Sequence, residues 1–265
     1  MPFHIHLKPL ESLVFRSDIV AIGTFRCPAM HPLFRDTGPC SYHTFVFPRT
    51  ATIIRHEGGA PFTATPNCIT LYNQGQLYTR TKISNVDASD WYVVADDVLF
   101  AATGRDIHPF RETHVSIDSR TYLAQRRLLE SLSDPFEVDE KVLALLGRVI
   151  SATPSKKPAP LLRDKVEAVK ETIAAAPARH VSLRRLAATV DSSPFHLCRA
   201  FREVTGMSMT SYRHALRLRL ALDLLREREG LSDIAFRLGY VSHSHFTSAF
   251  HRHFGITPSQ FRARS

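Results

Sequence analysis

Short apolar runs alternate with turn-forming residues over the first 115 or so positions of the chain. The runs are rich in Val, Ile, Thr and aromatic residues, which favour β-strands; among them are SLVF, DIVAIGTF, HTFVF, TATIIRH, CITLYN and WYVV. Stretches rich in Gly, Pro, Asn and Asp separate these runs at intervals of roughly ten residues, as in antiparallel sandwiches and barrels. The pattern therefore predicts an antiparallel β domain up to about residue 115.

The period of the pattern changes near Arg120. From there the apolar positions follow helical spacing, which predicts two amphipathic helices within residues 120–150, separated by Asp134 and Pro135. Two roles fit this helical pair: it packs on the β domain, or it forms the seam of a homodimer. With these helices included, the first domain is expected to span residues 1–150.

Residues 151–160, SATPSKKPAP, contain three prolines and two lysines and little apolar surface. Such a composition predicts an interdomain linker. Residues 161–265 show helical periodicity throughout and are expected to form a second, all-α domain.

A helix-turn-helix layout occurs first at residues 182–206. Ser182 is positioned to cap a short helix, and the sequence Asp191 to Pro194 supplies a turn. On the helix that follows, Leu197 and Phe201 define an apolar side. The opposite face carries Phe195, Cys198, Arg199 and Arg202. This face is the one expected to enter a groove of DNA.

The same layout returns about 49 residues later, at residues 232–254. Ser232 is the expected cap of its first helix and Gly239 makes the turn. In the helix that follows, Phe246 and Phe250 face the core. The opposite face carries Ser244, Thr247, Ser248 and His251.

One long helix is predicted between the two units, over residues 209–228. Its 20 or so residues would span about 30 Å, close to the roughly 34 Å between successive major grooves on one side of B-DNA. The expected partner is therefore double-stranded DNA, such as a promoter, with two half-sites about one helical turn apart.

Charge supports this interpretation because it is concentrated in the second domain. Residues 161–265 hold 17 Lys and Arg against 9 Asp and Glu, a net of +8, whereas residues 1–160 hold 17 against 16, a net of +1. A basic helical domain is typical of proteins that bind a polyanion.

The tract from Gly239 to Arg262, GYVSHSHFTSAFHRHFGITPSQFR, resembles the C-terminal signature of the AraC/XylS family of bacterial transcription regulators. An upstream tract that includes Leu186, His196, Arg199 and Gly206 is similar to the first unit of that family. The resemblance covers about residues 162–263. It implies that Phe195, Cys198 and Arg199 occupy base-reading positions, and arginine can bond guanine bidentately.

This chain departs from the family pattern in the second unit, where Ser248 and His251 stand at places often held by arginine and lysine. Either the second helix reads DNA through weaker contacts and water, or its histidines and Arg252 contact phosphates.

The resemblance also implies a cupin-like β-barrel at the N-terminus that binds a small-molecule effector, and a regulator, more often an activator, that contacts RNA polymerase. The tract PNCITLYNQGQLYTR is similar to sensor domains of some family members. The aromatic residues expected to line a ligand pocket, or else to form simple core, are Phe45, Phe47, Tyr72, Tyr78 and Trp91.

Two alternatives involve other chemistry. Cys27 and Cys40, with His31 and His43, could make the regulator responsive to thiol oxidation or to a metal. A cupin-type metalloenzyme with an accessory nucleic-acid-binding domain would need a tighter cluster of His and Glu than the sequence offers. The favoured reading has no catalytic residue, no metal and no cofactor, so the chain is not expected to be an enzyme.

Location follows from the same composition. No window reaches the 18 apolar residues of a membrane span, and the first residues lack a secretory signal. The chain is expected to be cytoplasmic, without a membrane partner.

Overall fold

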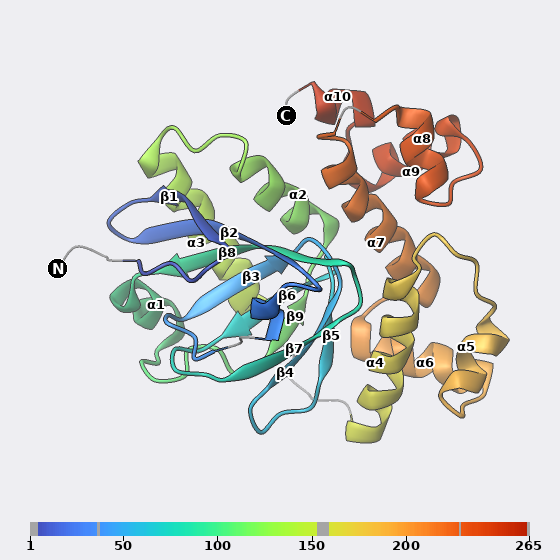
Figure 1. The fold of residues 1–265 in the computed structure, drawn as a ribbon, viewed down its shortest axis with the longest axis horizontal. Coiled ribbons are helices and arrows are strands. Elements are labelled where there is room, and N and C mark those ends of the chain that lie inside the picture. Colours follow the sequence, from blue (N-terminus) through green and yellow to red (C-terminus); the bar gives the residue numbers. More distant parts are fainter. Residues whose placement is uncertain (1–4, 36–37, 153–158, 228, 264–265) are drawn as a thin grey trace. The chain divides into compact units, whose positions relative to one another are not determined.

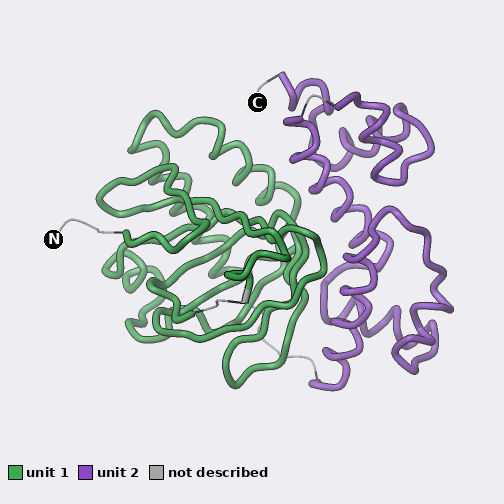
Figure 2. The backbone as a smooth tube through the Cα atoms, in the orientation of Figure 1, with its two compact units in different colours: residues 1–154 green, residues 155–265 purple. Residues whose placement is uncertain are grey.

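The chain folds into two compact units, Met1–Pro154 and Ser155–Ser265, which Figure 2 shows in separate colours. The computed structural model describes residues 5–35, 38–152, 159–227 and 229–263. Of the predicted linker 151–160, residues 153–158 lie outside the described residues.

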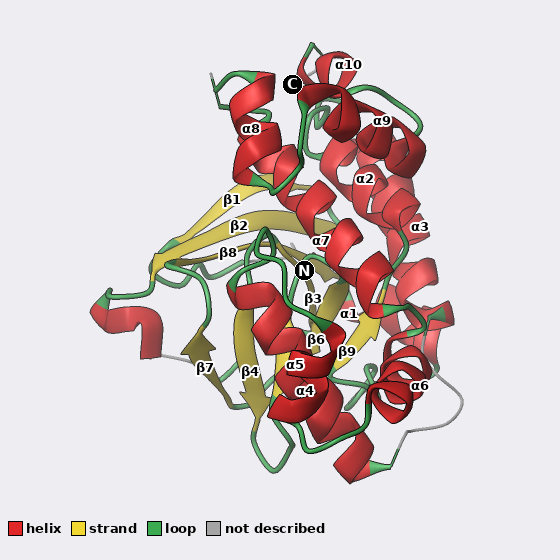
Figure 3. Ribbon diagram, turned by 90° about the vertical axis from the view of Figure 1, so that its right-hand side faces the viewer, coloured by secondary structure: helices red, strands yellow, loops and turns green. Residues whose placement is uncertain are grey.

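The first unit contains two antiparallel sheets (Figures 1 and 3). Six strands pair in the order β1-β2-β8-β3-β6-β9, and three in the order β5-β4-β7. Their bounds are β1 Glu11–Arg16, β2 Val20–Pro28, β3 Thr44–Pro48, β4 Thr52–His56, β5 Phe62–Ala64, β6 Cys68–Tyr72, β7 Tyr78–Lys82, β8 Val86–Val94 and β9 His114–Ser116. The predicted antiparallel β fold is confirmed, but the strands make two separate sheets and not one closed barrel.

Helical segments accompany these sheets. They are the short 3-10 helix η1 (Pro32–Arg35), α1 (Asp96–Thr103), α2 (Ser119–Leu128) and α3 (Pro135–Ser151). Asp134 caps α3 by accepting hydrogen bonds from the amides of Phe136 and Glu137, and Pro135 takes the first helical position. The break predicted at these two residues is therefore confirmed. Helix α1 was not predicted, because only Leu99 in it is buried and it has no apolar stripe.

A buried ion cluster attaches α2 to the large sheet. The carboxylate of Asp90 in β8 lies 3.4 Å from Nη1 of Arg126 in α2, and both side chains are fully buried. It also accepts a hydrogen bond of 2.9 Å from Nε2 of Gln125, which donates to the Tyr92 hydroxyl as well. Arg49 contributes a second guanidinium at 3.5 Å. Two cations thus compensate one carboxylate between helix and sheet.

The second unit is helical over its described residues. Its helices are α4 Pro160–Ala175, α5 Leu183–Thr189, α6 Pro194–Thr205, α7 Met209–Leu224, α8 Leu231–Arg237, α9 His243–Phe254 and α10 Pro258–Arg262. Ser182 caps α5 as predicted, accepting a hydrogen bond from the amide of Arg185. The expected cap at Ser232 is wrong, because α8 begins after Gly230 and Ser232 lies inside the helix.

Helix α7 is shorter than predicted, ending at Leu224 instead of residue 228. Its 16 residues span about 24 Å, against the 30 Å or so expected. The cause is tertiary: Nε of Arg262 donates to the carbonyl of Leu225 at 3.0 Å and Nη2 to that of Glu229 at 2.7 Å. These bonds hold the segment that follows α7 against Arg262 of α10, so that its carbonyls of Leu225 and Glu229 accept from a side chain and not from helical amides.

Candidate nucleic-acid interface and cavity

The two helix-turn-helix units repeat each other in their capping as well as in their sequence. Ser193 caps α6 and Ser242 caps α9, each by accepting a hydrogen bond from the third amide of its helix. Both helices have 12 residues and end at a left-handed glycine, Gly206 with φ 72° and Gly255 with φ 75°. The units therefore present two helices of equal length, each in the second position of its unit.

Each of these helices has one buried and one exposed face. In α6 the buried residues include Leu197 and Phe201, and in α9 they are Phe246, Phe250 and Phe254. The structure leaves the predicted DNA-binding residues on the other face: Phe195, Cys198, Arg199, Arg202, Ser244, Ser248 and His251 are exposed, and Thr247 is half-buried. Both sets therefore lie where a groove could be contacted.

The two exposed faces differ in charge. The face of α6 carries two guanidinium groups, on Arg199 and Arg202, and an apolar side chain, Phe195, which is 73% exposed. The face of α9 carries hydroxyl groups and His251, and the hydroxyl of Thr247 lies 3.3 Å from Nε2 of His243. Of the predicted contact residues, those whose side chains can attract phosphate at any pH or bond a base bidentately thus lie on α6.

The first unit contains a cavity of about 310 Å³ lined by residues of both sheets. Alternate positions of β8 reach it, namely Asp87, Ser89, Trp91 and Val93, as the two-residue period of a strand requires. Tyr72, Tyr78 and Trp91 of the predicted ligand set line it. The volume is at the lower end of the roughly 300–1,000 Å³ typical of small-molecule sites.

Phe45 and Phe47 do not line this cavity, so the pocket role predicted for them is wrong, and they are buried core residues, as in the alternative. On β3 the lining residues are Thr44, Val46 and Pro48, which puts both phenylalanines on the opposite face of the sheet. There they contact the ring of Tyr92, with centroid distances of 5.1 and 5.5 Å. The prediction chose residues by type and ignored the alternation along the strand.

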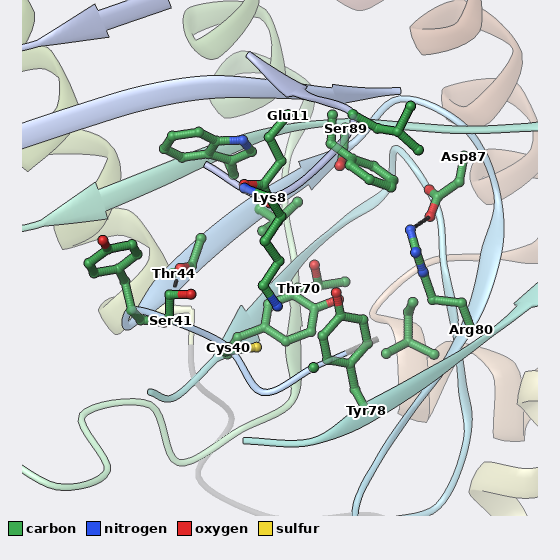
Figure 4. Close-up of a pocket in the computed structure, with 18 of the residues that line it drawn as sticks. Lys8, Glu11, Cys40, Ser41, Thr44, Thr70, Tyr78, Arg80, Asp87 and Ser89 are labelled. Atoms are coloured by element: carbon green, nitrogen blue, oxygen red, sulfur yellow. Dashed lines mark hydrogen bonds and ion pairs between the residues drawn. The ribbon is translucent and has the colours of Figure 1, made fainter. Parts of the chain in front are cut away.

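Charged side chains also line the cavity, and sequence reasoning missed all of them. Nη1 of Arg80 lies 3.1 Å from the carboxylate of Asp87, while Nη2 donates to the carbonyl of Leu33. Nζ of Lys8 donates to the carbonyl of Pro39 at 2.7 Å. Figure 4 shows these groups around the cavity. The only available signal was their alternation with apolar residues, as in the pattern Tyr78-x-Arg80.

Burial changes the acid–base properties of two carboxyl groups in the cavity. It raises the pKa of Asp87, although the neighbouring Arg80 opposes this. It also raises the pKa of Glu11, against the hydrogen bond that its carboxylate accepts from the amide of Lys8. The cavity is therefore a desolvated environment in which charges need partners.

The structure does not support the cysteine and histidine set as a sensor. Burial raises the pKa of both thiols, that of Cys40 to about 12, which disfavours the reactive thiolate. Nδ1 of His31 accepts a hydrogen bond from the backbone amide of Leu33, and Nδ1 of His43 accepts one from the backbone amide of Gln74. Within the described residues, no three side chains of His, Cys, Asp or Glu are grouped to hold a metal ion.

Within the described residues, no helix is both long enough and apolar enough to cross a bilayer.

Residues 186–264 match the model of a family described as a helix-turn-helix domain. The chain is 42% identical over 65 residues to the HTH-type transcriptional activator RhaR of Pectobacterium carotovorum, which covers 24% of this chain and 23% of that protein. It is 36% identical over 97 residues to the HTH-type transcriptional regulator RipA of Corynebacterium glutamicum, covering 37% and 29%. The chain thus spans only about a quarter of the length of such relatives.

Among solved structures, an AraC-type DNA-binding domain protein from Chromobacterium violaceum is 30% identical, covering 38% of this chain and 93% of that chain with a TM-score of 0.37. ToxT from Vibrio cholerae is 10% identical, covering 93% and 95% with a TM-score of 0.38. By these matches, the C-terminal residues of the chain form a helix-turn-helix domain similar to those of AraC-type transcription regulators.

Proposed function

We propose that this protein regulates transcription by reading two DNA half-sites through the exposed faces of α6 and α9. The observation that carries the proposal is the structural repeat: two capped helices of equal length, each with a buried apolar face and an exposed polar face, in a basic unit. Major grooves accept a helix of this kind, with its N-terminal residues at the base edges.

Arg199 is the residue proposed to read a base. It lies in the middle of α6, and its side chain is exposed. Arg202, one turn nearer the C-terminus, and the half-sites' phosphates are the proposed source of non-specific affinity. The second half-site is proposed to be read more weakly, since the face of α9 carries no arginine or lysine among its predicted contacts.

The proposal is tested by selecting genomic fragments with the full-length protein at near-physiological salt and sequencing what is retained. A motif of two half-sites about one helical turn apart supports it. Sequence-blind retention that disappears with a modest increase in salt contradicts it, since binding to phosphates alone is strongly salt-dependent and carries no sequence preference.

A second part of the proposal concerns the cavity of the first unit, proposed to hold a small-molecule effector that shifts the affinity for DNA. Its support is a desolvated space of about 310 Å³ with aromatic walls and paired charges. Trp91 lines the cavity and is the only tryptophan of the chain, so its fluorescence reports occupancy directly. A compound that changes this fluorescence and not the affinity for DNA would argue against an effector role.

Three finer points complete the proposal. The protein acts as an activator through contact with RNA polymerase, by analogy with relatives that are named activators. It acts in the cytoplasm, without catalytic activity. The pair α2 and α3 is the proposed homodimer seam, and Phe136 on α3, 80% exposed, is an apolar side chain available for it.

A further inference from the structure

Helix α7 carries a buried arginine that bonds to both halves of the DNA-binding unit. We call α4 to α6 the first half and α8 to α10 the second half. The guanidinium of Arg217 donates from Nε to the carbonyl of Pro177 at 2.6 Å and from Nη2 to that of Ala178 at 2.9 Å. Its third nitrogen, Nη1, lies 3.5 Å from the carbonyl of Gly239.

These three carbonyls come from two separate places in the chain. Pro177 and Ala178 form the turn between α4 and α5, just before the first helix-turn-helix unit. Gly239 is the turn residue of the second unit, four positions before α9 begins. One side chain, 7% exposed, therefore contacts the entry to the first unit and the turn of the second.

The two backbones also contact each other directly at this place. A Cβ atom added to Gly239 would lie 2.6 Å from the carbonyl oxygen of Ala178 and 3.1 Å from its Cα. Gly239 has a φ of 78°, a conformation that residues with a side chain adopt rarely. The turn of the second unit thus rests on the first half with no room for a side chain between them.

We infer that Arg217 is a positioning residue that fixes the orientation of α9 relative to α6, and so sets the spacing between the two half-sites that the protein accepts. This inference rests on the proposed reading of DNA by both helices. The planar guanidinium suits the role because its donors diverge in fixed directions, whereas a lysine offers one compact ammonium group.

A small change at the junction of Arg217, Ala178 and Gly239 would move the far end of α9 by a large distance. Helix α9 has 12 residues and is about 18 Å long, so a rotation of about 10° at its start would move its far end by about 3 Å. That displacement is as large as a whole hydrogen-bond length. A loosened junction would therefore leave each half-site motif intact and relax the spacing between them.

The test is a selection of random DNA by the full-length wild type and by Arg217→Lys, with the spacing between half-site motifs counted in the retained sequences. We expect the wild type to favour one spacing over its neighbours by about tenfold, comparable to the cost of one mismatched base pair. In Arg217→Lys that preference should fall to about two- or threefold, with both half-site motifs unchanged.

Arg262→Lys is the matched control. Arg262 also donates to two carbonyls, those of Leu225 and Glu229, but neither belongs to the first half. It should lose stability without losing the spacing preference. Equal broadening in Arg262→Lys, or an unchanged tenfold preference in Arg217→Lys, would overturn the inference.

Gly239→Ala provides a second variant if Arg217→Lys does not fold, because it perturbs the same junction from the other side. It is expected to broaden the spacing as well. The selection with the wild type separates the two proposals. Half-site motifs without a preferred spacing would overturn the inference about Arg217 and leave the proposed function standing. The absence of any motif would overturn both.

Discussion

Removing the guanidinium of Arg126 should strongly destabilise the first unit. In Arg126→Met the carboxylate of Asp90 would stay buried between α2 and the large sheet, and it would lose a cation that lies 3.4 Å away. The amide of Gln125 and the guanidinium of Arg49 would remain as its partners.

The magnitude follows from these contacts. Breaking a buried ion pair by removing one partner costs about 3–5 kcal/mol, because the other charge is left uncompensated. Since Arg49 and Gln125 remain, we expect a loss near the lower end, about 3 kcal/mol. Changing both members, in Asp90→Asn with Arg126→Met, removes the stranded charge and should recover about 1–2 kcal/mol of the free energy of unfolding.

The assay is urea unfolding of the full chain followed by tryptophan fluorescence. Trp91 is the only tryptophan and is adjacent to Asp90 in β8, so the signal reports the unit that is perturbed. With a urea dependence of about 2 kcal/mol per molar, the midpoint should fall by about 1.5 M.

Lys141→Met serves as the control, since it removes an exposed ion pair with Glu137 in the same unit and should cost less than about 1 kcal/mol. The reasoning is refuted if Arg126→Met costs no more than this control, or if the double variant is as unstable as the sum of its single changes.

Three further predictions follow. Gly23→Ala should displace the indole of Trp91, because the new Cβ would lie 2.0 Å from its Cζ2; a loss of about 1–3 kcal/mol or more and a shifted emission maximum are expected, and an unchanged spectrum would contradict this. Arg199→Ala should weaken DNA binding by about 1–3 kcal/mol and relax the preference at one base pair, whereas Arg184→Ala, on the exposed side of α5, should not alter sequence preference; equal loss on all sequences would make Arg199 a phosphate contact. Burial lowers the pKa of His56 from 6.5 to about 4, so unfolding takes up a proton between these two pH values. The free energy of unfolding should therefore not depend on His56 above pH 6.5, and it should fall by roughly 3 kcal/mol at most between pH 6.5 and pH 4. His56→Gln should abolish this fall, as measured by urea unfolding at several pH values.

Local signals in the sequence were sufficient for the second helix of each repeated unit. Ser193 and Ser242 cap their helices, Gly206 and Gly255 end them, and the apolar spacing separates buried from exposed faces, as the structure has them. These features depend on neighbours within about four residues, so the chain specifies them before any tertiary contact forms.

Strand pairing and cavity lining depended on partners far away in the chain. The sequence predicted antiparallel strands, but the division into sheets of six and three depends on which strands meet, and no local pattern records that. Phe45 and Phe47 were assigned to the cavity by residue type, whereas the pairing of β3 with β8 turns them toward Tyr92. Lys8 and Arg80 entered the lining from segments whose place in the fold is set by the same long-range contacts.

The length of α7 shows the same division of causes. Its helical periodicity was visible in the sequence, but its end was set by Arg262, which bonds carbonyls 33 and 37 residues away. In the sequence, Arg217 cannot be distinguished from the other basic residues of its amphipathic helix. Only folding brings the carbonyls of Ala178 and Gly239 to its guanidinium. The sequence by itself determined the second helix of each repeated unit and its buried and exposed faces, because these depend on near neighbours. The tertiary structure alone decided how the two halves are joined, because that depends on carbonyls brought together from distant parts of the chain.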